Sequence, residues 1–362
     1  MENGITKKQS AILQGVAIWM MVYHHLYSFA LEYESLLPFL QADTVRKIAW
    51  FCKLCVGIFA FVSGYGMYYV MKGQPKEQFW GRLLAEYRCV LIRILKLYGK
   101  LWLVLLIYMG IYFGILRFPF APEQLLGNLT ALNPTYNGAW WYMEQYAKML
   151  LVLPFLDLLL TRFEQSAERK RKRIFFLALT VVGIVAALVG ILWQPVLWEL
   201  LLAVKSGLRI SFLLIFVVGY LIARFALYQR VDKGLRHLGR WTPICLSVAL
   251  IGVVIALRVT LATDAAYAKL DFLFTPLLVY GVLTLLTYVP FLCSFLTWWG
   301  HQSTYIWLVH GLLYGWLHLL IKPRVRLDIW IYLAVLLVSA AVSLLLKVLE
   351  KLPGKLYMRK CR

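Results

Sequence analysis

Two adjacent histidines, His24 and His25, stand inside an apolar segment near the start of the sequence. A polar imidazole in such a segment is costly to place unless it has a hydrogen-bond partner or a function. Imidazole can take up and release a proton near neutral pH, which activation of a hydroxyl nucleophile requires. Gln14 lies eleven positions before His25, about three helical turns, so both side chains share one helix face. We therefore expect His25 to act as a general base. His24, about 100° around the helix, is expected to be a buried histidine bonded to a neighbouring helix.

The composition indicates which elements must position these residues. Of the 362 residues, 62% are hydrophobic and only 15% are charged, whereas soluble chains have about 45–50% apolar and about 25% charged residues. The apolar residues fall in blocks of about 20, long enough to cross a bilayer. We predict an all-α polytopic membrane protein with about ten transmembrane helices, forming a single domain over residues 1–362. The predicted spans are 10–30, 50–71, 91–116, 139–161, 174–193, 208–228, 241–262, 271–290, 302–321 and 328–349.

The formal net charge of +21 predicts how the chain is oriented. Most Lys and Arg residues stand beside apolar blocks, which is typical of cytoplasmic loops near anionic lipids rather than of nucleic-acid binding. The basic stretches 72–96, 162–173, 224–240 and 347–362 fall on one side if there are ten spans. We therefore predict a multi-pass protein of the cytoplasmic membrane with both termini in the cytoplasm. The basic loop 322–326 is an exception to this pattern.

Cys52 and Cys55 form a C-x-x-C pair, a spacing used in redox and metal sites. No second Cys or His pair lies nearby in the sequence, so we interpret both as packing residues and expect no metal. The first apolar block is too long for a cleavable signal peptide and is expected to remain as an anchor helix.

Several stretches of the sequence resemble motifs of the bacterial acyltransferase 3 family. The segment from Gln14-Gly15 to His25 matches the spacing at which family members place a basic residue, a glycine and a histidine. Gln14 departs from the pattern, because the family prefers a cation there. The run ending in Ser63-Gly64-Tyr65 is similar to the family's Ser-Gly-aromatic ending.

Three later stretches extend the resemblance over essentially the whole chain. Arg93 matches one member of the family's paired-arginine motif, whereas Val90 stands at the partner position. Residues 137–142 (Asn-Gly-Ala-Trp-Trp-Tyr) open the fourth predicted span as in the family. The stretch from Gly300 to His310 closely resembles Gly-Lys-x-Ser-x-x-Ile-Trp-Leu-x-His.

This resemblance implies an O-acyltransferase. Family members pass an acyl group, usually acetyl from cytoplasmic acetyl-CoA, to a hydroxyl of an extracytoplasmic glycan or related acceptor. The chemistry requires a base, cations that hold the CoA phosphates, and a hydrophilic path across the bilayer. Some relatives carry a fused esterase-like domain; we expect this chain to act directly on its acceptor or with a separate envelope enzyme.

The resemblance also suggests roles for particular residues. His25 is the expected base, and Glu144, near the outer end of the fourth span, is the carboxylate that could orient it. An acidic residue in an interfacial aromatic belt is the alternative interpretation of Glu144. A basic stripe at the start of the third span could bind the donor, although ordinary anchoring of cytoplasmic loops explains such cations too. The donor-binding candidates are Arg93, Lys96, Arg88 and Gln14.

For the acceptor, Ser303 and His310 lie seven residues apart on one helix face, where packing against the first span is the alternative role. Trp141 and Arg209 complete the acceptor-binding candidates. A carrier or flippase for a glycan or lipid would also use many spans with intramembrane polar residues. An inactive sensory or anchoring module is a third possibility, because Gln14 replaces the family's cation.

Overall fold

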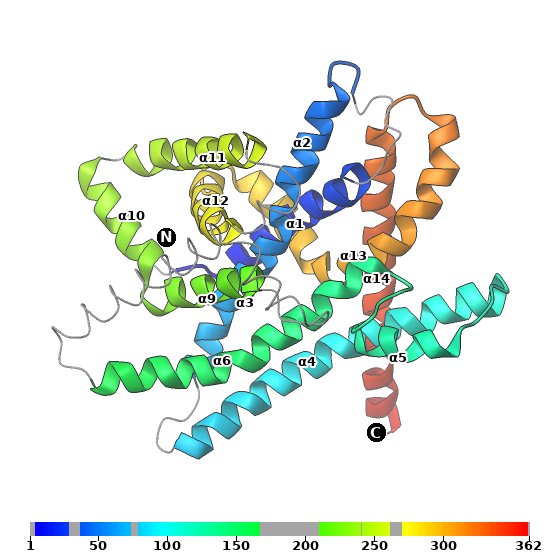
Figure 1. Ribbon diagram of the computed structural model, residues 1–362, viewed down its shortest axis with the longest axis horizontal. Helices are drawn as coiled ribbons and strands as arrows, with labels where there is room; N and C mark the ends of the chain where they lie inside the picture. Colours follow the sequence, from blue (N-terminus) through cyan, green and yellow to red (C-terminus); the bar gives the residue numbers. More distant parts are fainter. Residues whose placement is uncertain are drawn as a thin grey trace, which may run out of the picture.

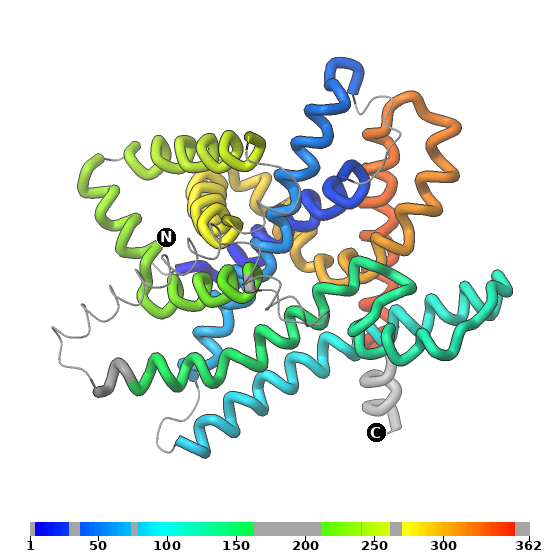
Figure 2. Tube along the Cα trace, viewed as in Figure 1, coloured from blue at the N-terminus to red at the C-terminus, as the bar shows by residue number. Residues whose placement is uncertain are grey.

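The structure is a computed structural model, and it describes residues 4–28, 37–73, 79–166, 210–239, 241–260 and 270–360. The described residues form helices joined by short connections, which confirms the all-α prediction (Figures 1 and 2). The helices are α1 (Lys7–Tyr27), α2 (Ala42–Cys52), α3 (Leu54–Lys72), α4 (Phe79–Met109), η1 (Gly110–Ile115), α5 (Pro122–Thr130), η2 (Gly138–Trp140), α6 (Trp141–Ser166), α9 (Ile210–Arg224), α10 (Leu227–Leu238), α11 (Thr242–Thr260), α12 (Asp271–Leu286), α13 (Pro290–Ile321), η4 (Lys322–Arg324) and α14 (Ile329–Lys360).

Among the described residues, four helical segments are long and apolar enough to cross a membrane: Ala42–Lys72, Thr242–Thr260, Pro290–Arg324 and Ile329–Lys351. The pair Ser211–Arg224 and Leu227–Leu238, bent by 61°, passes the same test together and makes a fifth. Many large apolar side chains face outward, such as Leu106, Phe291 and Leu319, which are 68%, 84% and 72% exposed. Such a surface suits lipid rather than water. The chain is an integral membrane protein; ten spans and cytoplasmic termini stay predictions, and the predicted span 174–193 lies outside the described residues.

One predicted boundary is wrong. The stretch between Pro290 and Gly300, which we expected to connect two spans, is the beginning of the single 32-residue helix α13. The chain turns earlier, at the short link between α12 and Pro290, because proline has no N–H to donate and is accommodated in the first turn of a helix. The glycine motif that begins at Gly300 therefore lies inside a helix, where it packs against another helix.

Helices α1 and α13 cross at a very short distance. A Cβ atom added to Gly15 would meet the backbone carbonyl of Leu296, and one added to Gly300 would meet the carbonyl of Ala11. Gly15 and Gly300 are 285 positions apart, and so are His25 and His310, whose rings lie 4.9 Å apart ten residues further along each helix. The two helices therefore run parallel. Small residues let membrane helices approach this closely and gain packing energy. The two motif glycines therefore serve helix packing.

Helices α3 and α9 repeat this arrangement. A Cβ on Gly64 would meet the carbonyl of Phe216, and one on Gly219 would meet the carbonyl of Phe61. One turn beyond Gly64 and Phe216, the rings of Tyr68 and Tyr220 lie 5.7 Å apart, so these helices are also parallel. The Ser63-Gly64 motif thus positions α3 against α9, with Ser63 on an adjoining face.

Candidate functional site

A cavity of about 150 Å³ lies between α1, α3, α4, α6 and α13. It brings together four candidate residues from three motifs of the sequence: Gln14, His25, Trp141 and Ser303. The remaining lining residues are Met21, Cys55, Val56, Phe59, Ser63, Leu97, Ala139, Tyr142, Tyr146, Thr304 and Trp307.

Helix α1 contributes one face to this cavity, as its spacing predicted. Gln14, Met21 and His25 line it at positions i, i+7 and i+11. His24 points elsewhere: its Nδ1 lies 2.8 Å from the carbonyl oxygen of Ala49 in α2 and 2.6 Å from Oγ of Ser28. This confirms the interpretation of His24 as a histidine bonded to a neighbouring helix.

Helix α13 brings a second histidine against His25. The ring centroids of His25 and His310 are 4.9 Å apart, and 310 − 25 is again 285, the offset of the glycine crossing. Nδ1 of His310 lies 2.8 Å from the carbonyl oxygen of Trp307. A carbonyl only accepts, so Nδ1 carries the proton and Nε2 of the neutral ring is an acceptor. That Nε2 is buried and has no hydrogen-bond partner among the described residues.

The motif at residues 137–142 fixes the start of α6 against α13. The side chain of Asn137 caps η2 by accepting from the amide of Ala139 at 3.0 Å, and it donates to the carbonyl of Leu308 at 3.1 Å. The indole of Trp140 donates to the same carbonyl at 2.9 Å, and the indole of Trp307 donates to the carbonyl of Ala139 at 3.2 Å. These four bonds hold the wall of the cavity that carries Trp141.

Tyr142 is a candidate that the sequence analysis did not single out. It lines the cavity, and its hydroxyl is buried without a hydrogen-bond partner among the described residues. A buried hydroxyl usually has a partner, so an unpaired one beside a cavity indicates a group available to a ligand. The only signal in the sequence was its place at the end of the Asn-Gly-Ala-Trp-Trp-Tyr motif.

Other predicted site residues lie away from the cavity. Glu144 pairs with Lys148 one turn later and is not among the cavity-lining residues, so its role in orienting His25 stays a prediction. Arg88, Arg93 and Lys96 are exposed on α4 and do not line the cavity, although Leu97 does. Their role in donor binding also stays a prediction. Arg209 lies outside the described residues.

The cavity lining is largely aromatic and aliphatic, and none of the described residues that line it is Lys, Arg, Asp or Glu. Such a space suits a small uncharged group, because an unpaired charge is expensive to bury. A phosphate group would therefore have to lie outside it.

Of the two cysteines of the C-x-x-C pair, Cys55 lines the cavity, and both are buried free thiols. In the part of the chain that the structure describes, no group of three or more His, Cys, Asp or Glu residues could hold a metal ion.

Comparison with known families gives one match. Residues 11–348 match the family Acyl_transf_3, described as "Acyltransferase domain". The match covers nearly the whole chain and includes every lining residue of the cavity. No curated protein and no solved structure matches the chain.

Proposed function

Since the chain belongs to the acyltransferase 3 family and is an O-acyltransferase of the membrane, we propose that it transfers acetyl from cytoplasmic acetyl-CoA to a hydroxyl of an extracytoplasmic glycan. The observation that supports this best is the cavity, in which His25 lies with Gln14, Trp141 and Ser303. Its size and uncharged lining suit a short, neutral acyl group better than a dicarboxylic one. The conversion needs only a base, a site for the thioester and access for the acceptor.

In the proposed reaction, His25 first takes up a proton and later returns it. The imidazole removes the proton from the acceptor hydroxyl as its oxygen attacks the thioester carbonyl carbon. The carbon–sulfur bond breaks, the new ester stays on the acceptor, and the thiolate of CoA takes the proton from the imidazolium. The ring of His310 lies 4.9 Å from that of His25, and we assign to it the role of orienting the His25 ring. We assign contacts with the acceptor to Ser303 and Trp141, which line the same cavity.

Charge develops on the thioester oxygen in the transition state, and a hydrogen-bond donor there lowers the barrier. The unpartnered hydroxyl of Tyr142 is the group we assign to that role. Replacing Tyr142 with phenylalanine is expected to lower the turnover number about 10²-fold, with little change in the Michaelis constant for acetyl-CoA. Steady-state kinetics on purified protein test this. Tyr146, which lines the same cavity, gives the matched control Tyr146→Phe; an equal loss in both variants would contradict the specific role of Tyr142.

The side of the membrane from which the donor arrives follows from the basic stretches. Lys and Arg beside membrane helices favour the cytoplasmic side, and CoA is a cytoplasmic metabolite, so the donor and the basic stretches share a side in this proposal. The acceptor then reaches His25 from the other side, directly or through a separate envelope enzyme.

The test is a comparison of envelope polysaccharides from cells with and without this gene. Mass spectrometry should show one or more acetyl esters in the first sample that are missing from the second and return on complementation. If the glycans are identical but an unmodified lipid-linked glycan accumulates in the deletion strain, transport rather than acyl transfer would be favoured.

A further inference from the structure

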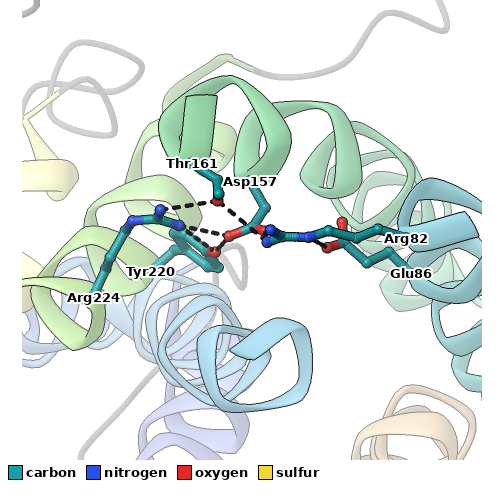
Figure 3. A network of polar contacts seen from close by, with 6 residues as sticks. All are labelled: Arg82, Glu86, Asp157, Thr161, Tyr220 and Arg224. Carbon is teal, nitrogen blue, oxygen red and sulfur yellow. Dashed lines mark hydrogen bonds and ion pairs between the residues drawn. The ribbon is translucent and has the colours of Figure 1, made fainter. Parts of the chain in front are cut away.

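A buried cluster of arginines and acids lies between α4, α6 and α9 (Figure 3), and none of its residues lines the cavity. Arg82 of α4 and Arg224 of α9 both donate to the carboxylate of Asp157 in α6, and Arg224 does so at 2.6 Å. The hydroxyl of Thr161, one turn later, accepts from Arg82 at 3.2 Å and from Arg224 at 3.1 Å. We call this set the arginine cluster: Arg82, Glu86, Asp157, Thr161, Tyr220 and Arg224.

The cluster contains or adjoins one described arginine from each of three basic stretches of the sequence. Arg82 stands in the first turn of α4, Arg224 is the last residue of α9, and Arg162 directly follows Thr161. These positions belong to the stretches 72–96, 224–240 and 162–173, which are far apart along the chain. A polyanion that approached this basic side would meet the cluster at the ends of the helices.

The distance from the cluster to the cavity suits one particular class of ligand. Along α6, Asp157 is eleven residues beyond the cavity-lining Tyr146, and along α4, Glu86 is eleven residues before the cavity-lining Leu97. Each separation is about 16 Å of helix. The pantetheine arm of CoA places about a dozen atoms between its sulfur and its first phosphate, and such a chain extends on the order of 15 Å. A thioester in the cavity would thus place that phosphate near the arginine cluster.

The donor set of the cluster fits phosphate. Guanidinium groups bind phosphate and carboxylate in the same forked geometry, and here two of them converge on one carboxylate. The hydroxyl of Tyr220 donates to the same carboxylate. Asp157 is 2% exposed and Arg82 is 8% exposed, so the carboxylate neutralises cations that are almost out of water. The second oxygen of Glu86 is buried and has no hydrogen-bond partner among the described residues. One acceptor of the cluster therefore lacks a hydrogen bond.

We propose that Arg82 and Arg224 bind a phosphate of the acyl-CoA donor, and that Asp157 is an internal anion which holds both guanidiniums until the phosphate displaces it. The proposal rests on the proposed function, because it assigns the donor of that reaction to a second site. The competing view is that the cluster only joins three helices. The two views differ in the expected effect of removing the charge of Asp157. If the phosphate competes with Asp157, the donor should bind more tightly. If the cluster only joins three helices, donor binding should not become tighter.

The test is calorimetric binding of CoA and of pantetheine, which lacks the phosphates, to the purified full chain in lipid nanodiscs. Asp157→Asn is expected to tighten CoA binding roughly tenfold, because the competing anion is gone. Arg82→Gln and Arg224→Gln are each expected to weaken it roughly tenfold or more. None of the three should change pantetheine binding more than about twofold. Arg230→Gln, at an exposed arginine of α10 outside the cluster, is the matched control and should bind both ligands as the wild type does.

A further variant covers the case in which these proteins do not fold, because removing one partner of a buried ion pair is destabilising. Thr161→Asp places a permanent anion between the two guanidiniums and removes no charge. It is expected to weaken CoA binding roughly tenfold and to leave pantetheine binding unchanged. Wild-type affinity for CoA in Thr161→Asp, or equal losses for CoA and pantetheine, would overturn the proposal. Binding is read without turnover, so a chain that binds CoA through the cluster but acetylates no glycan would contradict only the proposed function.

Discussion

Replacing His25 with alanine is expected to lower the turnover number for acetyl transfer by about 10²–10⁴-fold and to leave the protein folded. Among the described residues that line the cavity, the titratable side chains are those of His25, Cys55, Tyr142 and Tyr146. Without an imidazole the acceptor hydroxyl would have to lose its proton to water or to no base at all. The measurement is the initial rate of transfer from labelled acetyl-CoA to envelope glycan, over a range of donor concentrations.

The Michaelis constant for the donor should change little, because the proposed donor phosphates are held elsewhere. His301→Ala is the matched control, since His301 is an exposed histidine of the same motif as His310 and does not line the cavity. His24 is unsuitable as a control because its ring is bonded to α2. Unchanged labelling in His25→Ala would end its assignment as the base.

Gly15→Ala is expected to have the second large effect, a loss of folded protein. The new methyl group would collide with the backbone carbonyl of Leu296, which cannot move away as a side-chain tip can. Overpacking costs about 1–3 kcal/mol where side chains can adjust, and an obstructing backbone places this variant at or above the upper end. The midpoint of thermal unfolding in detergent, followed by size-exclusion fluorescence, should fall clearly. Gly300→Ala, on the other side of the crossing, should behave alike.

Gly252→Ala provides the control for this prediction. Gly252 lies in α11 with no atom within 4 Å of an added Cβ. Alanine is favoured over glycine in a helix by about 1 kcal/mol, so this variant should be as stable as the wild type or more stable. If Gly15→Ala matched Gly252→Ala, the close crossing of α1 and α13 would be contradicted.

The sequence predicted the helices better than it predicted their ends. Blocks of apolar residues fixed the helical class and the approximate place of α1, α11 and α14. They did not predict that α4 begins at Phe79 rather than near residue 91, because its first turns carry charges that pair inside the protein. A hydropathy pattern treats Arg82 and Glu86 as loop residues, because it shows neither that they pair with each other nor that Arg82 also pairs with Asp157 of α6.

The candidate site was predictable where one helix carried the information. The spacing of Gln14 and His25 sufficed to place both on one face, and the cavity contains both. The pairing of His25 with His310 depends on the register between two helices 285 positions apart, to which spacing within either helix gives no clue. For the same reason the sequence suggests Glu144 by its depth alone; its carboxylate pairs with Lys148, and its role in orienting His25 stays a prediction.

The parallel crossing of α1 and α13 has a consequence for how the protein is made. Helix α1 is translated before α13, the helix that, 285 positions later, packs on Gly15 and places a ring beside His25. Until α13 is made, Gly15 and His25 of α1 lack the helix that packs against them. Helix α1 is not among the described helical segments that are long and apolar enough to cross a membrane. Its stable residence in the bilayer is therefore expected to depend on α13, so the active site matures only near the end of biosynthesis.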